Sequence, residues 1–251
     1  MKNILITAGG TSEPIDRVRS ITNTGTGRLG SIIADTFAVK DGIGRIFYLC
    51  SASAVRPSSE RITVIEIKTT ADLQTAVQNL LAEQRIDAVV HSMAVSDYTV
   101  SAVSSAEELA KYLQKEDISS NPEKKILHAM EQTDIRAKTG KISSQIESPL
   151  LLLKQTPKIL PLFRELSPNA VVVGFKLLSD TAEEVLLDTA FRLLQQNGCE
   201  FVLANDSAHI HGDRHTGFLI DRQKNVLTFH TKQEIAVGIA NAVIEEMEKK
   251  A

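Results

Sequence analysis

Short apolar runs alternate with amphipathic helical stretches along most of this 251-residue chain. The run at residues 3–8 is continuous rather than apolar at every second residue, as expected of a strand buried on both faces of a parallel sheet. Strands are predicted for residues 3–8, 45–51, 61–67, 86–93, 169–175 and 199–205, and helices for residues 28–39, 71–84, 182–196 and 232–250. This order predicts a Rossmann-like, doubly wound α/β fold with a mostly parallel sheet and helices on both faces.

The pattern changes near the C-terminal end. Residues 216–221 and 225–231 are two further strand-like runs, and they flank the short segment Arg-Gln-Lys. Such spacing is typical of a hairpin. We therefore predict that an antiparallel pair closes the sheet.

A polar segment rich in Ser, Lys and Glu interrupts the alternation at about residues 98–148. Residues 107–114 are predicted as a short helix within it, and residues 121–125 and 134–148 as loops. A polar segment this long inside a compact domain is commonly a functional lid or disordered. We predict a single domain over residues 1–251 that carries a flexible flap or insertion at this place.

Composition limits the classes of partner. A net charge of −3 argues against nucleic acid or a membrane surface bound through bulk charge. Aromatic residues make up only 4% of the chain, so platforms for base stacking are scarce. No apolar run is long enough for a membrane-spanning helix, and no signal peptide is recognisable. With Cys50 and Cys199 as its only cysteines, the chain has no disulfide framework, and we expect a cytoplasmic location.

The stretch NTGTGRLG places Gly25, Gly27 and Gly30 in the pattern G-x-G-x-x-G. In NAD-binding proteins this pattern directly follows a strand, and an acidic residue follows about 20 residues later. Here the nearest predicted strand ends at Ala8, and the next strand ends in Cys and Ser rather than in an acid. We therefore interpret the glycines as a phosphate cradle at a helix N-terminus for a ligand other than NAD.

Polar residues collect after several predicted strands, at the edge of the sheet where doubly wound folds bind ligands. Gly9 and Gly10 allow the backbone to approach a ligand, and Thr11 adds a hydroxyl. Arg19 suits an anionic substrate, whereas Arg17 is interpreted as surface charge. Asp97 follows a buried strand and could bind a cation or an amine, or cap a helix.

Three histidines lie close together in the stretch HIHGDRH, namely His209, His211 and His215. Three such residues could chelate zinc. A solvated turn that leads into the hairpin is the favoured interpretation.

Several stretches together resemble the phosphopantothenate–cysteine ligases of coenzyme A synthesis, and they follow the family's order. The matching stretches are ITAGGTSEPIDRVRSITNTGTGRLG, AVSDY, KISS followed by LLLLKQTPKIL, VVVGFK and LAND. The chain resembles the stand-alone bacterial form, since no flavin-binding decarboxylase precedes Met1. The resemblance implies a ligase that joins 4′-phosphopantothenate to L-cysteine with CTP through an acyl-cytidylate, with Mg²⁺ as cofactor, acting as a homodimer.

The resemblance also implies roles for individual residues. Asn23 matches the amide that holds the intermediate, and Lys141 matches the lysine of a flap that closes over it. By composition alone, Lys141 would be a solvated surface residue. The positions that match substrate contacts are Arg19, Ala94 and Asp97. The positions that match nucleotide contacts are Gly9, Gly10, Thr11, Gly27, Arg28, Phe175 and Lys176.

The chain departs from the family pattern in three places. An insertion at about residues 99–137 separates Lys141 from Asp97, so Lys141 is aligned by KISS alone, with Lys138 as the alternative. The first acid after VVVGF is Asp180, and no basic run precedes LAND. Two other functions are kept as alternatives: an NAD(P)-dependent oxidoreductase and a non-catalytic nucleotide-binding module on the same fold.

Overall fold

The computed structural model of the chain describes residues 1–115, 120–136 and 140–250. The chain forms two compact units. Unit 1 comprises Met1–Thr11, Thr24–Val95 and Lys158–Ala251, and unit 2 comprises Ser12–Asn23 and Ser96–Pro157. The expectation that residues 1–251 form one domain stays a prediction.

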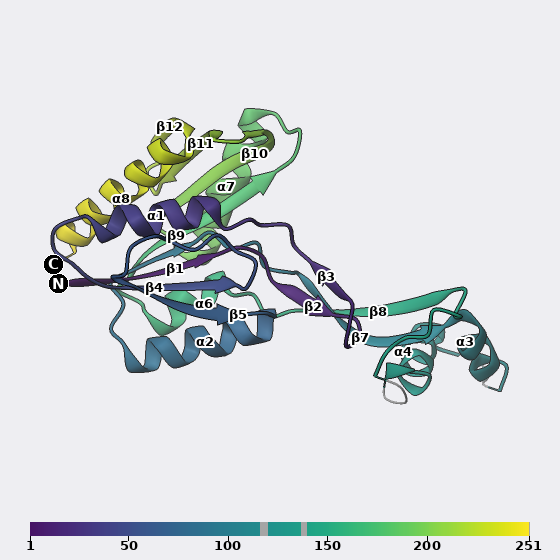
Figure 1. Ribbon diagram of the computed structural model, residues 1–251. Coiled ribbons are helices and arrows are strands. Elements are labelled where there is room, and N and C mark those ends of the chain that lie inside the picture. The colour runs from purple at the N-terminus through teal and green to yellow at the C-terminus, as the bar shows by residue number, and fades with distance from the viewer. Residues whose placement is uncertain (116–119, 137–139, 251) are drawn as a thin grey trace. The chain divides into compact units, whose positions relative to one another are not determined.

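Unit 1 is built on one eight-stranded sheet with the order β12-β11-β10-β9-β6-β1-β4-β5 (Figure 1). The strands from β10 to β5 in this order pair in parallel, and β10–β11 and β11–β12 are antiparallel. The predicted α/β fold with a mostly parallel sheet and a closing hairpin is therefore confirmed. The strands are β1 Lys2–Ala8, β4 Ile43–Ser51, β5 Ile62–Ile67, β6 Ala88–His91, β9 Val171–Leu178, β10 Phe201–His211, β11 Arg214–Asp221 and β12 Val226–Thr231.

Helices cover both faces of this sheet (Figure 1). One face packs against α1 (Arg28–Ala38) and α8 (Lys232–Lys249). The other packs against α2 (Thr70–Glu83), α6 (Leu160–Leu166) and α7 (Glu183–Asn197). Strand β1 shows why its apolar run is continuous. Ile4 and Ile6 belong to the first core and Leu5 to the second, and all three are fully buried.

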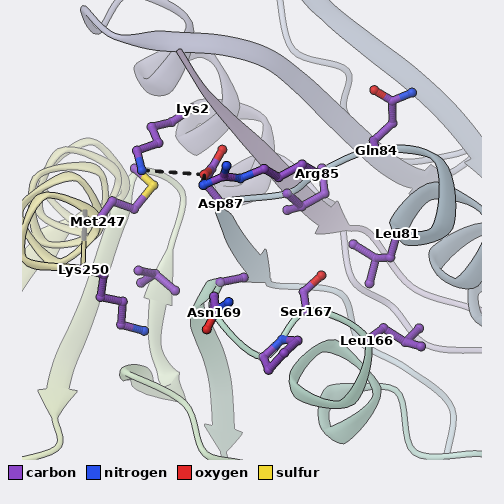
Figure 2. Close-up of a pocket in the computed structure, with 14 residues that line it drawn as sticks. Lys2, Leu81, Gln84, Arg85, Asp87, Leu166, Ser167, Asn169, Met247 and Lys250 are labelled. Carbon is purple, nitrogen blue, oxygen red and sulfur yellow. Dashed lines mark ion pairs between the residues drawn. The ribbon is translucent and has the colours of Figure 1, made fainter.

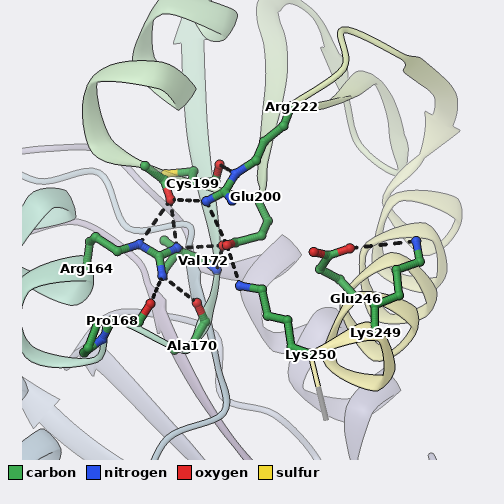
Figure 3. A network of polar contacts seen from close by, with 11 residues as sticks. Arg164, Pro168, Ala170, Val172, Cys199, Glu200, Arg222, Glu246, Lys249 and Lys250 are labelled. Atoms are coloured by element: carbon green, nitrogen blue, oxygen red, sulfur yellow. Dashed lines mark hydrogen bonds and ion pairs between the residues drawn. The ribbon is translucent and has the colours of Figure 1, made fainter.

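A buried carboxylate joins several elements of unit 1 just before β10 (Figure 3). Glu200, only 2% exposed, accepts hydrogen bonds from Arg164 at 2.7 Å and from Lys250 at 2.6 Å. Arg222 forms an ion pair with it at 2.8 Å, and the backbone N–H of Val172 donates to it at 2.7 Å. A buried charge is tolerated when it is paired and hydrogen-bonded in this way. The cluster fixes α6, the end of α8 and the turn between β11 and β12 against the sheet.

Unit 2 contains two antiparallel strand pairs, β2 (Ser12–Pro14) with β3 (Ser20–Thr22) and β7 (Tyr98–Ser105) with β8 (Pro149–Gln155). Helix α3 spans Ala106–Leu113 and confirms the predicted short helix.

The loop predicted for residues 121–125 is wrong, because these residues begin α4 (Pro122–Gln132). Asn121 precedes a proline in the first turn, followed by Glu123, which is a helix start signal hidden in a polar run. Residues 116–119 and 137–139 of the predicted flap lie outside the described residues. Movement of the flap stays a prediction.

Candidate functional site

The loop after β1 packs so closely near the start of α1 that Gly9, Gly25 and Gly27 have no room for a side chain. Gly9 has a φ of +86°, and a Cβ atom there would lie 2.6 Å from Ser51 Oγ. A Cβ atom at Gly25 would lie 2.5 Å from the carbonyl oxygen of Gly9, and Gly27 caps α1 with a φ of +72°. Glycine permits both the backbone angles and the close approach. These contacts give the predicted cradle its shape, and its binding of phosphate stays a prediction.

The glycines do not directly follow a strand of the central sheet. Residues 9–27 separate β1 from α1, and they include the short strands β2 and β3. Strand β4 ends at Ser51, whose buried Oγ has no hydrogen-bond partner among the described residues. This geometry differs from the tight strand-to-helix turn of an NAD site.

Ala94 joins the same edge of unit 1. It forms an isolated parallel bridge with Gly10, its N–H donates to the Gly9 carbonyl at 2.9 Å, and its carbonyl accepts from the Thr11 N–H at 3.1 Å. The side chain of Thr11 is fully buried, and its hydroxyl accepts a hydrogen bond from Thr70 at 3.4 Å. The structure therefore brings the predicted loop residues together with Ala94 through backbone contacts, while the Thr11 hydroxyl contacts the protein.

Helix α1 begins with Gly27 and Arg28. Gly27 has no side chain to cap the helix, and the N–H of Arg28 makes only a long hydrogen bond of 3.4 Å to the Thr26 hydroxyl. The first turn contains no acidic residue. The partial positive charge at this end is thus uncompensated by the helix itself, which favours an anion. The guanidinium of Arg28 is exposed and pairs with Asp213 at 3.0 Å.

Phe175 and Lys176 lie in β9 and point to opposite faces of the sheet, as successive strand residues must. Phe175 packs against the core beneath α1 and α8. Lys176 pairs in register with Ala204, whose side chain belongs to the opposite core. The structure therefore does not bring these two predicted nucleotide contacts to one side.

Unit 2 holds the other predicted residues, Arg19, Asn23, Asp97 and Lys141. The carbonyl of Asp97 accepts from the Thr156 N–H at 3.0 Å, where β7 and β8 begin to pair.

Asp16 of unit 2 was not among the residues predicted from sequence, and it contacts both Arg19 and Ile142, the neighbour of Lys141. Its carboxylate accepts hydrogen bonds from the N–H groups of Val18 and Arg19 at 2.8 Å and of Ile142 at 3.0 Å. The Arg19 guanidinium lies 3.4 Å away. These hydrogen bonds, that from Ile142 first, hold the pKa of the Asp16 carboxyl below its usual value.

The three histidines do not form a solvated turn, so that interpretation is wrong. His209 and His211 are exposed residues of β10, and His215 is a buried residue of β11. The distance from Asn205 Nδ2 to His215 Nε2 is 2.8 Å. Across the part of the chain that the structure describes, no three His, Cys, Asp or Glu side chains are grouped as a metal site.

A cavity of about 740 Å³ lies at the opposite, amino-terminal ends of the strands, where β1, β6 and β9 begin (Figure 2). Within it the Asp87 carboxylate forms ion pairs with the Lys2 ammonium at 3.7 Å and with the Arg85 guanidinium at 3.3 Å. Ligands of doubly wound sheets bind beyond the carboxyl ends of the strands, so the candidate site is the glycine-lined edge and not this cavity. None of the helices within the described ranges is both long and apolar enough to cross a membrane.

The sequence model of the DNA/pantothenate metabolism flavoprotein C-terminal domain matches residues 1–138 and 133–247. The chain belongs to this family. A relative from Thermococcus kodakarensis, the coenzyme A biosynthesis bifunctional protein CoaBC, is 28% identical over 237 residues, which cover 94% of this chain and 49% of the relative. The chain thus spans about half the length of the coenzyme A biosynthesis relatives that it matches over nearly its whole length.

Two solved structures share the fold of this chain. The crystal structure of the DNA/pantothenate metabolism flavoprotein from Streptococcus pneumoniae is 34% identical, covers 100% of both chains and has a TM-score of 0.81. A Cab2 variant in complex with phosphopantothenate-cysteine is 17% identical, covers 99% of this chain and 87% of its own, and has a TM-score of 0.70. The likeness to Cab2 concerns the fold alone.

Proposed function

We propose that this chain is a phosphopantothenate–cysteine ligase of coenzyme A synthesis. It joins 4′-phosphopantothenate to L-cysteine with CTP and yields 4′-phosphopantothenoyl-L-cysteine, CMP and pyrophosphate. The family match and the coenzyme A biosynthesis name of the Thermococcus kodakarensis relative support this assignment. The structural observation that supports it best is the cradle in which the backbones of Gly9, Gly25 and Ala94 meet beside the start of α1.

In the first step, the carboxylate of phosphopantothenate attacks the α-phosphorus of CTP, and the bond to the leaving pyrophosphate breaks. The carboxylate is a poor electrophile until this phosphate ester makes one of its oxygens a good leaving group. Such a transfer depends mainly on positioning and on neutralising charge. The glycine loop and the start of α1 supply backbone N–H groups for the phosphates, and Arg28 supplies a positive charge.

In the second step, the cysteine amine attacks the acyl carbon, loses a proton, and CMP departs. Asn23 holds the acyl-cytidylate through its amide, and Lys141 neutralises the departing phosphate. Arg19, Ala94 and Asp97 contact the substrates. The hydrogen bonds from Ile142 and Arg19 to Asp16 support this part of the proposal, because they tie the segments that carry Lys141 and Arg19 to one carboxylate.

We propose that Mg²⁺ arrives with CTP. Mg²⁺ in nucleotide sites is held by one or two carboxylates together with the substrate's phosphates and water. No all-protein cage is required, which is compatible with the lack of any grouped set of three ligands among the described residues. When bound, Mg²⁺ would neutralise triphosphate charge.

The oxidoreductase alternative is disfavoured by the long separation of β1 from α1. We further propose that the protein acts as a homodimer in the cytoplasm. Neither nucleic acid nor a membrane is proposed as a partner.

The test is release of pyrophosphate from each of the four nucleoside triphosphates, with and without phosphopantothenate. The expected result is release from CTP that depends on phosphopantothenate, followed by a cysteine adduct when cysteine is added. Absence of pyrophosphate with every nucleotide would overturn the ligase. Consumption of NADH in its place would establish the alternative.

A further inference from the structure

Lys232, the first residue of α8, is a cation in an unusual place. The residue is only 8% exposed, and its Nζ donates a hydrogen bond to the carbonyl of Gly212 in the turn between β10 and β11. Burial lowers the pKa of the Lys232 ammonium, the Asp213 carboxylate opposes this shift, and Arg28 adds to it. Burying an ammonium is unfavourable unless a negative charge compensates it.

The charges around Lys232 do not balance. The nearby carboxylate, Asp213, is also paired with Arg28 at 3.0 Å, and its side chain is 79% exposed. Glu234, in the first turn of α8, accepts instead from the His230 N–H at 2.7 Å. Two cations therefore share one solvated carboxylate beside the start of α1. This arrangement has an excess of positive charge that suits an anionic ligand.

Beside Lys232, two buried side chains have incomplete hydrogen bonding. Asn205 Nδ2 lies 2.8 Å from His215 Nε2, and within the described ranges Asn205 Oδ1 and His215 Nδ1 have no partner. Burial first, and Lys232 second, lower the pKa of His215 to about 4, so its ring is neutral at pH 7. A neutral ring has one donor and one acceptor nitrogen, so the pair has at least one donor and one acceptor unused whichever way the amide is assigned.

Unused buried polar atoms are rare in folded proteins, and they indicate a group that is absent, such as a ligand or its bound water. Both residues are more than nine-tenths buried. Lys232 acts electrostatically on His215. Its backbone N–H donates to the Asp213 carbonyl at 3.2 Å, and the Asp213 carboxylate pairs with Arg28 at 3.0 Å. Phosphate-compatible charge and unfilled hydrogen bonds therefore coincide at one place in unit 1.

The cluster lies on the same face of the sheet as Phe175. Phe175 pairs with Leu203 in register, and Asn205 follows two residues later on the same face of β10. Helices α1 and α8 cover this face side by side (Figure 1). The ion pair between Arg28 and Asp213 at 3.0 Å joins this cluster to the first residue of α1.

We infer that Lys232, with Arg28, binds the β- and γ-phosphates of the nucleotide, and that the Asn205–His215 pair completes its hydrogen bonds when that group and its water are present. The outer phosphates carry most of the nucleotide's charge and match a pair of cations. This inference rests on the proposed use of CTP, and it adds Lys232 as a phosphate-binding residue at the first turn of α8.

The experiment measures the Kd of CMP, CTP and inorganic pyrophosphate by calorimetry for the wild type and Lys232→Gln. The expected result is a loss of about tenfold in affinity for CTP and pyrophosphate, the scale of one charged hydrogen bond, with CMP unchanged. Lys249→Gln is the matched control, because Lys249 is an exposed lysine of the same helix paired with Glu245. It should bind all three like the wild type.

Equal losses for CMP and CTP, or no loss for either, would overturn the inference. So would a wild type that binds neither CTP nor pyrophosphate. Arg28→Gln should reproduce the pattern and keeps the test valid if Lys232→Gln does not fold, since the Arg28 side chain is 55% exposed. Wild-type pyrophosphate release with unaltered binding by both variants would reject this inference and leave the ligase standing. Binding of pyrophosphate that depends on Lys232, without any ligase activity, would support this inference and reject the proposed ligase.

Discussion

The carboxylate of Asp16 accepts a hydrogen bond from the backbone N–H of Ile142 at 3.0 Å, across 126 positions of sequence. The same carboxylate accepts from the Arg19 N–H, and the Arg17 N–H donates to the Gly140 carbonyl at 3.1 Å. Within unit 2, the segment that carries Arg19 and the segment that carries Lys141 are thus held together.

This contact should depend on pH. The folded-state pKa of Asp16 lies below its ordinary value of 3.8, so ionised Asp16 stabilises the folded state above pH 3.8. The contribution should be lost as the pH falls through the lowered pKa. Amide exchange at Ile142, corrected for its intrinsic pH dependence, should show protection that persists at pH 4 and disappears in stronger acid. Asp16→Asn should remove this transition, and an unchanged transition in the variant would contradict the assignment.

Gly25→Ala should weaken nucleotide binding. A Cβ atom there would lie 2.5 Å from the backbone oxygen of Gly9, and backbone cannot rotate away as a side chain can. We expect the Kd for CTP to rise by at least about tenfold, the result of roughly 1.4 kcal/mol of lost binding. Gly42→Ala is the control, because its Cβ would meet nothing within 4 Å and its strain comes only from a φ of +76°. Normal CTP binding by Gly25→Ala would show that the cradle is not the nucleotide site.

Asn23→Asp should abolish most turnover with folding intact. If Asn23 holds the acyl-cytidylate as proposed, the variant places a carboxylate beside its phosphate, and loss of one positioned donor commonly reduces turnover about 100-fold or more. Steady-state kinetics with circular dichroism as a check on folding would measure this. Asn79→Asp, the same change at an exposed position of α2, should have normal kinetics. Activity of Asn23→Asp within a few-fold of the wild type would remove Asn23 from the site.

Lys141→Gln should separate the two half-reactions. If Lys141 acts on the departing CMP, the variant should still release pyrophosphate and should accumulate enzyme-bound acyl-cytidylate, with little cysteine adduct. Rapid-quench analysis with labelled CTP would detect the intermediate. Lys154→Gln, an exposed lysine of β8, should behave like the wild type. Normal product formation by Lys141→Gln would mean that another lysine has this role, and Lys138, which lies outside the described residues, is the candidate.

Glu200→Gln should destabilise unit 1. The substitution leaves Arg164, Arg222 and Lys250 around a group without charge, and breaking a buried ion pair costs about 3 kcal/mol. Urea denaturation should show the loss as a lower midpoint. Glu248→Gln is the control, since Glu248 is exposed near the end of the same α8. Equal midpoints for the two variants would show that the partly exposed cations are satisfied by water.

The central sheet could be predicted from sequence because its inner strands, such as β1 and β6, are buried on both faces and form nearly continuous apolar runs, as Ile4, Leu5 and Ile6 show. The same rule failed where strands leave the core. His209 and His211 continue β10 as exposed polar residues after its buried run ends at Asp206, so the continuous apolar pattern does not extend to them. Helix α4 was missed because its start signal lies in a charged run, where few of its residues are buried.

The candidate site could be predicted only where residues close together in sequence determine the backbone conformation. The glycines of the cradle indicated close backbone approach, and the gap between β1 and α1 argued correctly against the NAD turn. Asp16 was missed because its role depends on Ile142, which no local pattern connects to it. The Asn205–His215 pair was missed for a similar reason, since its two members meet only through the register of β10 and β11.

The bridge between Gly10 and Ala94 lies at the point where the winding of the sheet reverses direction. From β1 the chain proceeds through α1 to β4 and β5 on one side, whereas from β6 it proceeds to β9 and β10 on the other. The connections that follow these two neighbouring strands diverge. In doubly wound folds such divergence leaves a crevice at the ends of the strands, and the core beneath it stays fully packed. Substitutions beside the bridge can therefore change which ligand is accepted while the strand order, which the buried runs of β1 and β6 determine, stays the same.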